Sequence, residues 1–288
     1  MICVVTRFGK KKDIVRNRCY GLEERASGRC EMLAIFFSLV ISSGQPGVIG
    51  VMSAMEVELE FIGSDMIIER IDTIGANVYR TGTINRVPCV MVHGGVGKVG
   101  AAHTAQTLIM QYDVDAVIFT GVAGGVDPSL CIGDIVISDN VVHHDFGQIL
   151  PDDFIPFDTI GFFADSLLVQ LARQAAGNVV LEKIPEAIRG EEDLPRIRVG
   201  RVATGDQFIS SEAKRLWIEE TFHADCVEME GAAVAQICAV HNVPFVIIRA
   251  LSDLANEEAE VDFQAFVFYA AKNSSMLVNE MLRLLAGN

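Results

Sequence analysis

The sequence predicts a single α/β domain, and two observations lead to this prediction. First, an apolar run at residues 245–255 ends in Arg249, Ser252 and Asp253, and Pro244 marks its start. A run of β-branched and aromatic residues is typical of a buried parallel strand. Second, half of the 288 residues are hydrophobic, so the chain can bury a large core.

Polar side chains at the end of this strand are candidates for a functional site. In open α/β sheets the ligand crevice lies at the carboxyl ends of the strands. Asp253 is therefore the first candidate. The alternative is that Asp253 caps the following helix by accepting hydrogen bonds from backbone N–H groups.

Charge and cysteine content exclude several classes of protein. The formal net charge of −15 argues against nucleic-acid binding, because phosphate contacts need clustered lysine and arginine. Seven cysteines are scattered without a Cys-x-x-Cys pair, which predicts neither a disulfide framework nor a zinc site. We expect no cofactor, no metal and a cytoplasmic location.

The amino-terminal segment differs from the rest of the chain. Two arginines precede Met32, and residues 32–44 hold an apolar run that ends in small residues. This is the layout of an export signal, and the run is too short to span a membrane comfortably. One interpretation is export with Met32 as the true start. The other is a peripheral helix on a cytoplasmic protein, or a misassigned start, so we treat residues 1–47 as an extension and 48–288 as the domain.

A second carboxylate candidate follows the first predicted strand, at residues 48–52. Glu58 stands at the carboxyl end of this strand and the start of a helix. Burial there would raise the pKa of its carboxyl while the helix dipole would lower it, so Glu58 is a candidate base. The alternative is an ordinary first-turn Glu that stabilises the helix. Strands at 76–81 and 87–93 are predicted to form a meander or hairpin beside the first strand.

Two glycine-rich segments follow predicted strands. Residues 94–100 lead into a helix and contain the pattern Gly-x-Gly-x-x-Gly. A dinucleotide fingerprint also needs an acidic residue about 20 positions later, which is missing from the right context, and a P-loop needs Ser or Thr where Val99 stands. The second glycine-rich loop, at 121–126, follows a buried strand at 116–120. Two such loops at neighbouring strand ends indicate a small ligand held against the main chain.

Further candidates lie in the second half of the chain. Glu228 and Glu230 flank Met229 before a small-residue helix, and a carboxylate there can accept two hydrogen bonds from sugar hydroxyls. Alternatively, one Glu caps the helix and the other is solvated. Phe208 follows a predicted strand at 199–204 and is either a stacking surface for a planar ligand or a core residue.

Other patterns favour structural interpretations. His143, His144 and Asp145 suggest a metal site, but adjacent histidines on an extended segment point to opposite faces. Residues 182–198 mix charges of both signs with prolines and predict a solvated loop. A closing helix starts near Phe263.

Six motifs in this order resemble the bacterial 5′-methylthioadenosine/S-adenosylhomocysteine nucleosidases of the nucleoside phosphorylase superfamily, over residues 48–288. The motifs are Ala54-Met55-Glu56-Val57-Glu58, Gly95-Val96-Gly97-Lys98-Val99, Thr120-Gly121-Val122-Ala123-Gly124-Gly125, Gly205-Asp206-Gln207-Phe208-Ile209, Val227-Glu228-Met229-Glu230 and Arg249-Ala250-Leu251-Ser252-Asp253.

The resemblance implies a single domain with a mixed, partly barrel-like sheet flanked by helices, and a homodimer. It implies hydrolysis of the N-glycosidic bond of methylthioadenosine and S-adenosylhomocysteine, with release of adenine and a thioribose. By position, Glu58 matches the base that activates water and Asp253 the acid that protonates adenine. The implied substrate contacts are Phe208, Ile209, Met229, Glu230, Phe263, Gly124 and Val122, and the implied supporting residues are Arg249, Ser252, Glu228 and Met55.

The sequence departs from the family at three places. Val122 stands where the family often has a hydroxyl residue that positions water. Residues 182–198 form a longer segment than expected, and residues 1–47 have no counterpart.

Other functions remain alternatives at this point. A phosphorylase of the same fold needs cationic and hydroxyl groups for phosphate, yet residues 94–100 contain no arginine and Glu58 would repel the anion. A futalosine-type hydrolase would use similar machinery. A non-catalytic nucleoside-binding protein needs neither Glu58 nor Asp253. The alternative of a dinucleotide-dependent oxidoreductase is supported only by the glycine pattern of residues 95–100.

Overall fold

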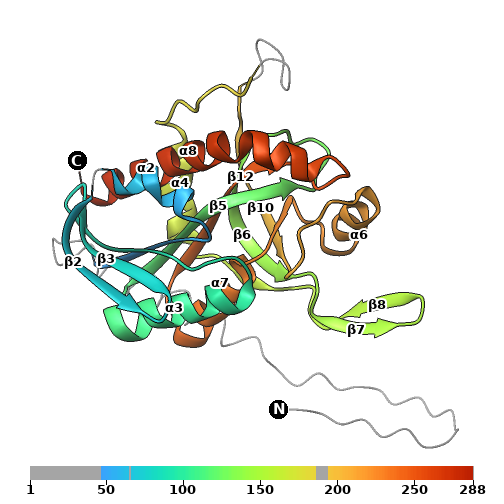
Figure 1. Cartoon of the computed structure of the whole chain (residues 1–288), viewed down its shortest axis with the longest axis horizontal. Helices are drawn as coiled ribbons and strands as arrows, with labels where there is room; N and C mark the ends of the chain where they lie inside the picture. Colours follow the sequence, from blue (N-terminus) through green and yellow to red (C-terminus); the bar gives the residue numbers. More distant parts are fainter. Residues whose placement is uncertain (1–46, 65, 186–193, 288) are drawn as a thin grey trace, which may run out of the picture.

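A computed structural model describes residues 47–64, 66–185 and 194–287 as a mixed β-sheet with helices on both faces (Figure 1). The predicted export signal and residues 186–193 of the predicted loop lie outside the described residues. The described strands are β1 (Ile49–Ser53), β2 (Ile67–Ile74), β3 (Asn77–Ile84), β4 (Val87–His93), β5 (Ala116–Gly125), β6 (Ile135–His143), β7 (Gly147–Leu150), β8 (Asp153–Pro156), β9 (Phe162–Phe163), β10 (Ile197–Thr204), β11 (Cys226–Glu228) and β12 (Phe245–Asp253). The described helices are α2 (Glu56–Gly63), α3 (Lys98–Tyr112), α4 (Ser166–Ala176), α6 (Glu212–Phe222), α7 (Gly231–His241) and α8 (Ala259–Leu285).

The main sheet is closed on itself along part of its width. Its strands run in the order β11-β10-β6-β12-β5-β1-β4-β3-β2, and β11 also pairs with β5. The strands β11, β10, β6, β12 and β5 therefore form a ring, which confirms the mixed, partly barrel-like sheet. β12 is parallel to β5 and antiparallel to β6, and Asp253 at its end is in register with Gly124.

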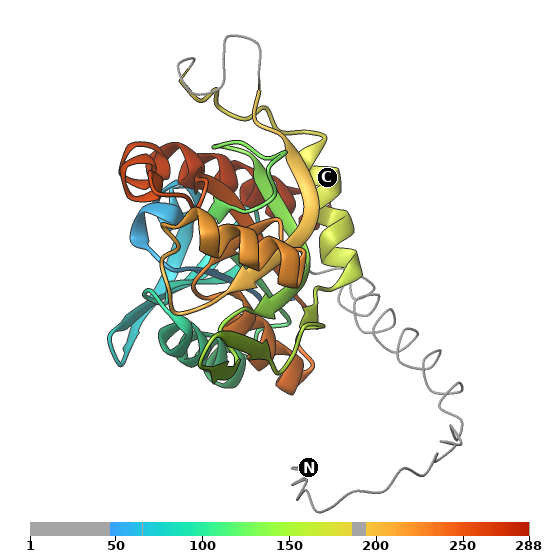
Figure 2. The same ribbon diagram turned by 90° about the vertical axis from the view of Figure 1, so that its right-hand side faces the viewer.

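Strand alternation divides the interior into two main apolar cores. In β12, Val246 and Ile248 belong to one core, whereas Phe245 and Ile247 belong to the other, because successive side chains point to opposite faces. The first core packs under α2, α4 and α8, and the second under α3 and α7 (Figures 1 and 2). All nine residues of β12 are buried, as expected for a strand covered on both faces.

Two sequence predictions about strands were wrong. The strand β2 was missed, because most of its residues are exposed and it lacks the alternation that marks a half-buried strand. Residues 121–125 were predicted to be a glycine-rich loop, yet they continue β5 as far as Gly125. Two of these glycines, Gly121 and Gly124, leave room for charged side chains that approach β5 from neighbouring segments.

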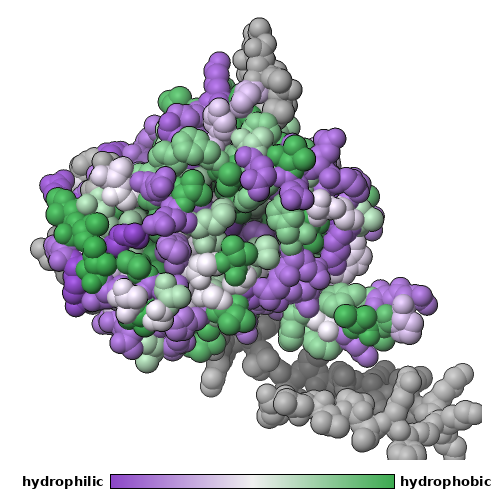
Figure 3. Space-filling model, in the orientation of Figure 1, coloured by the Kyte–Doolittle hydropathy of each residue, from purple (hydrophilic) through white to green (hydrophobic). Residues whose placement is uncertain are grey.

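The hairpin of β7 and β8 projects from the body of the protein (Figure 1). It and the chain on either side of it expose several large apolar side chains, and Figure 3 shows apolar surface on it. These side chains are Phe146, Ile149, Ile155, Phe157 and Ile160. Among the described residues, no helix is both long and apolar enough to cross a membrane.

Candidate active site

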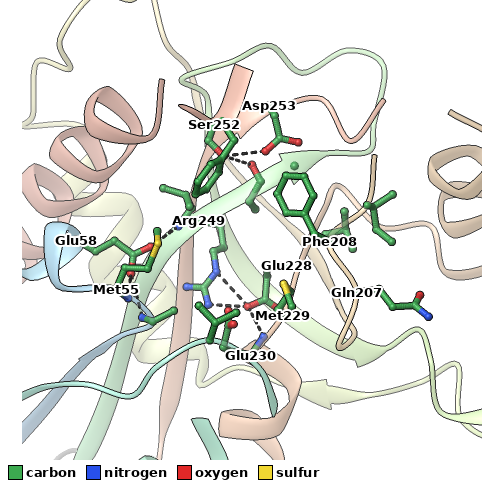
Figure 4. A pocket seen from close by; sticks show the side chains of 18 residues that line it. Met55, Glu58, Gln207, Phe208, Glu228, Met229, Glu230, Arg249, Ser252 and Asp253 are labelled. Atoms are coloured by element: carbon green, nitrogen blue, oxygen red, sulfur yellow. Dashed lines mark hydrogen bonds and ion pairs between the residues drawn. The ribbon is translucent and has the colours of Figure 1, made fainter. Parts of the chain in front are cut away.

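One pocket lies where the carboxyl ends of β1, β5, β11 and β12 converge, next to the segment after β10 (Figure 4). Every site residue predicted from the sequence lies in its wall. The lining residues are Ala54, Met55, Glu58, Val96, Val122, Ala123, Gly124, Gln207, Phe208, Ile209, Val227, Glu228, Met229, Glu230, Arg249, Ser252, Asp253 and Phe263.

Glu58 lies in the first turn of α2, and main-chain N–H groups hold its carboxylate in place. Its Oε2 accepts hydrogen bonds from the N–H groups of Ala54 (3.0 Å) and Met55 (2.9 Å), and its Oε1 accepts one from Val122 (3.1 Å). Burial raises the pKa of the Glu58 carboxyl, whereas the positive charge of Arg249 and these hydrogen bonds oppose the rise. The predicted effect of burial therefore acts on this group, and the opposing influences are the charge of Arg249 and the three main-chain hydrogen bonds.

Asp253 enters the pocket from a different wall (Figure 4). The hydroxyl of Ser252 donates to its Oδ2 (2.9 Å), and the N–H of Ala255 donates to its Oδ1 (2.9 Å). The side chain is buried, and burial raises the pKa of its carboxyl. The local contact with Ala255 resembles the predicted cap, but Asp253 ends β12 five residues before the cap position of α8, at Glu258.

Two glycines in β5 make room for the charged groups of the pocket. A Cβ on Gly121 would lie 3.0 Å from Oε1 of Glu58 and 3.0 Å from Nη1 of Arg249. A Cβ on Gly124 would lie 2.7 Å from Oδ1 of Asp253. The sequence predicted close approach of a ligand to this main chain; the structure shows that the protein's own side chains also require it.

Arg249 and Glu228 form an ion pair inside the protein. Nη2 of Arg249 lies 2.7 Å from Oε2 of Glu228, and each side chain is almost fully buried (1% and 2% exposed). Glu228 also accepts hydrogen bonds from the N–H groups of Glu230 and Gly231, and from the hydroxyl of Thr204. α7 begins at Gly231 with Glu230 at its N-cap position, so Glu228 is the glutamate whose carboxylate satisfies N–H groups at the start of this helix.

Glu230 has a different environment from Glu228. It lines the pocket but is only 5% exposed, so the alternative of a solvated Glu230 is wrong. Its Oε1 accepts a hydrogen bond from the N–H of Gly97 (2.7 Å), in the glycine-rich segment between β4 and α3. Burial, and next the negative charge of Glu228, raise the pKa of Glu230 to about 7.

The remaining wall is apolar. Phe208 and Phe263 contact each other edge to face, with ring centroids 5.8 Å apart. Phe208 is half exposed at the pocket, whereas the adjacent Ile209 is buried. Met55 and Met229 also line this space, so a planar ring or a thioether would meet side chains of matching polarity.

Several residues at the site were not predicted. Val96 and Gln207 lie inside motifs that were noticed, but nothing in their residue type singled them out. Thr204 supports Glu228, and Ser275 of α8 donates to the main-chain carbonyl of Glu58 (3.0 Å). Such contacts between distant segments leave no local pattern in a sequence.

The pair of histidines lies at the edge of the site. His143 lies near Gln236, and the buried ring of His144 has no hydrogen-bond partner. Asp145 pairs with Lys98 (2.6 Å). Among the described residues, no group of three or more His, Cys, Asp or Glu is arranged to hold a metal ion.

Comparison with known proteins places this pocket in a family. Residues 48–283 match the family model of the phosphorylase superfamily. A 5′-methylthioadenosine/S-adenosylhomocysteine nucleosidase of Mycobacterium bovis is 35% identical over 82% of this chain and 97% of its own length. The nucleosidase of Neisseria meningitidis, solved with methylthio-immucillin-A, is 32% identical, with a TM-score of 0.72 over 83% of this chain and 99% of that one.

A second kind of hydrolase is also similar in structure. The futalosine hydrolase of Helicobacter pylori is 30% identical, with a TM-score of 0.71 over 82% of this chain and 97% of that one. The 5′-methylthioadenosine/S-adenosylhomocysteine nucleosidase of Geobacillus thermodenitrificans is 39% identical over 82% of this chain and 96% of its own length. The chain therefore belongs to the phosphorylase superfamily and, within it, to the 5′-methylthioadenosine/S-adenosylhomocysteine nucleosidase family.

Proposed function

We propose that this protein hydrolyses the N-glycosidic bond of 5′-methylthioadenosine and S-adenosylhomocysteine, releasing adenine and a thioribose product. The observation that supports this proposal most is that two buried carboxyls, Glu58 and Asp253, enter one pocket from different walls. Cleavage of this bond develops positive charge on the ribose and negative charge on adenine. A carboxylate near the sugar stabilises the positive charge, and an acid near the base neutralises the negative charge by donating a proton.

Glu58 is suited to activate water. A carboxylate has about four acceptor positions, and main-chain N–H groups use two on Oε2 and one on Oε1. A second position on Oε1 is left for a water molecule that attacks the anomeric carbon. General-base assistance of this kind contributes roughly 10²–10⁴-fold to the rate.

Asp253 is suited to protonate adenine. A general acid must carry its proton at the moment of reaction, and burial raises the pKa of this carboxyl. The hydroxyl of Ser252 and the N–H of Ala255 fix the orientation of the two oxygens. Having the acid and the base on separate walls resembles inverting glycoside hydrolysis, where water attacks from the face opposite the leaving group.

The remaining pocket residues divide between the sugar and the base. Glu230 is placed to accept hydrogen bonds from ribose hydroxyls, with Met229 beside it. Phe208 and Ile209 form an apolar wall for adenine, and Phe263 extends it toward the alkylthio group. Arg249 offsets the negative charge of the three glutamates around it, Glu228, Glu230 and Glu58, so that these charges are not left uncompensated.

Release of the free purine base by the purified protein, as adenine or hypoxanthine, tests the proposed function. Methylthioadenosine, S-adenosylhomocysteine, inosine and futalosine would be compared with and without phosphate. We expect adenine from the first two in the absence of phosphate, and loss of this activity in Glu58→Gln. Strict phosphate dependence would indicate a phosphorylase, and faster turnover of futalosine would place the protein with the futalosine hydrolases. Binding without turnover would indicate a nucleoside-binding protein.

We also propose that the protein is a homodimer. The projecting hairpin β7–β8 exposes Ile149 and Ile155, and large exposed apolar side chains are typical of interfaces. Light scattering on the purified chain should give twice its mass of 31.3 kDa. A monomer at micromolar concentration would contradict this proposal.

We propose that the protein is cytoplasmic. The described cysteines are Cys89, Cys131, Cys226 and Cys238, and all four are free thiols, as is usual in a reducing compartment. Cell fractionation of the full chain tests this location. Recovery of a shortened form outside the cytoplasm would instead support export through residues 32–44.

A further inference from the structure

Three segments meet beside the pocket at a group of polar contacts that the proposed chemistry does not use. Oδ1 of Asp206 accepts a hydrogen bond from the N–H of Lys98 (2.8 Å). The ammonium of Lys98 lies 2.6 Å from Asp145, and the N–H of Asp206 donates to the same Asp145 (2.9 Å). These contacts join the start of α3, the end of β6 and the segment after β10.

The turn at the start of α3 also donates a hydrogen bond to Glu230, the glutamate that is proposed to bind the ribose. Two consecutive N–H groups there point to two carboxylates: that of Gly97 to Glu230 (2.7 Å) and that of Lys98 to Asp206 (2.8 Å). Gly97 has a φ of 95°, which favours glycine, and a Cβ on it would lie 3.2 Å from Oδ1 of Asp206. A shift of this turn away from Asp206 would therefore also move the N–H of Gly97, which donates to Glu230.

From this geometry we propose that Asp206 is a positioning residue for ribose binding, because it fixes the turn whose Gly97 N–H orients Glu230. Asp206 does not line the pocket, so it acts through this turn and not on the substrate. The inference rests on the proposed function, since it assigns Glu230 to the ribose.

The electrostatics of Glu230 provide a specific readout for this role. The charged groups that act on Glu230 are Glu228 on β11, Arg249 on β12 and Glu58 on α2. The hydrogen bond from Gly97 lowers the pKa of Glu230 against the effect of burial. Weakening this bond should raise the pKa further, so more of Glu230 would be protonated and unable to accept from the ribose.

The variant Asp206→Ala tests the inference through the KM for methylthioadenosine. We expect KM to rise about tenfold below pH 7, and by only about threefold above it, while kcat changes less than about twofold. The pH dependence follows because Glu230, with a pKa of about 7, is mostly ionised on the alkaline side. Inhibition by adenine, which has no ribose, should stay unchanged.

Two further variants separate positioning from folding. Asp206→Asn keeps an oxygen that can accept from Lys98 N–H, so it should restore KM to nearly the wild-type value. Arg283→Ala removes a similarly exposed ion pair with Glu280 on α8, and it should leave KM unchanged at every pH.

Other outcomes would overturn the inference. One is an unchanged KM in Asp206→Ala, and another is an increase in KM that is the same at all pH values. A third is a loss of adenine binding as large as the loss of methylthioadenosine binding. An inactive wild-type protein would instead remove the proposed function together with this inference. An active wild type with an unaffected Asp206→Ala would remove the inference alone.

Discussion

Glu58 and Asp253 are both buried carboxyls in one pocket, but the protein surrounds them differently. Glu58 accepts three main-chain hydrogen bonds and is influenced by the positive charge of Arg249. Asp253 accepts one main-chain hydrogen bond and one from a hydroxyl, and the charge that acts on it is the negative charge of Asp262. Burial raises the pKa of both groups, but around Glu58 a positive charge opposes this rise as well as hydrogen bonds, whereas around Asp253 only hydrogen bonds do.

This difference explains how two carboxyls can serve opposite purposes. Around Glu58 a positive charge and three main-chain hydrogen bonds favour the ionised form, which a base needs, against the effect of burial. Beside Asp253 the charge of Asp262 adds to the effect of burial and favours the protonated form, which an acid needs. Activity should therefore fall at low pH as Glu58 gains a proton, and at high pH as Asp253 loses its proton.

The largest effect is expected for Asp253→Asn. The amide keeps the size of the side chain and one of its two acceptor oxygens but cannot transfer a proton, so kcat for methylthioadenosine should fall by roughly 10²–10⁴-fold. Binding of the nucleoside, measured by calorimetry, should stay close to that of the wild type. Activity within about tenfold of the wild type would remove Asp253 from the role of acid.

The second prediction concerns Arg249→Met, which removes the positive charge that distinguishes the surroundings of Glu58. Glu228 would stay buried without its partner, so the free energy of unfolding should fall by about 3–5 kcal/mol in urea titrations. The pKa of Glu58 should rise further, which moves the acidic limb of the pH profile to higher pH.

Arg249→Lys serves as the comparison, because it keeps the charge without the forked guanidinium. It should retain the position of the acidic limb better than Arg249→Met does. A loss of less than about 1 kcal/mol in Arg249→Met would show that the buried pair is not needed for stability.

An intermediate effect is expected for Gly124→Ala, which disturbs only the Asp253 side of the pocket. The new Cβ would lie 2.7 Å from Oδ1 of Asp253, so the carboxyl must move. Displacement of a reacting group by about 1 Å can cost about 10²-fold, so kcat should fall by roughly 10–100-fold.

Gly125→Ala is the matched control for this substitution. Its Cβ would meet the side-chain ends of Leu251 and Leu254 at 3.1 Å, in place of a carboxylate. The kcat of this control should stay near the wild-type value. Equal losses in both variants would mean that the strand itself, and not the position of Asp253, is sensitive.

The same comparison shows what a sequence can predict about this site. Glu58 and Asp253 stand at the ends of apolar runs, and the rule that ligands lie at the carboxyl ends of strands was enough to select both. The strand β12 was also predicted, because a strand buried on both faces is apolar throughout.

The parts that were not predicted depend on tertiary contacts. Glycines usually mark loops, but Gly121 and Gly124 lie in β5 because Arg249 and Asp253 approach that strand. The different environments of Glu228 and Glu230 likewise depend on Arg249, from a strand that follows later in the chain. No local period or residue preference encodes such contacts.

The smallest effect is expected for Ser252→Ala, which removes one of the two hydrogen bonds that orient Asp253. That bond lowers the pKa of the Asp253 carboxyl. Without it the pKa should rise, so the protonated acid should persist to higher pH and the alkaline limb of kcat/KM should move upward. At neutral pH the lost orientation should cost only about threefold in kcat/KM.

Ser275→Ala is the control on the other side of the pocket, because the hydroxyl of Ser275 is also buried but donates to the main-chain carbonyl of Glu58. The alkaline limb should stay in place in this control, because Ser275 does not contact Asp253. A shift in Ser252→Ala alone would assign the alkaline limb to Asp253. Equal shifts in both variants, or a downward shift in Ser252→Ala, would assign that limb to another group and would break the contrast between the two carboxyls.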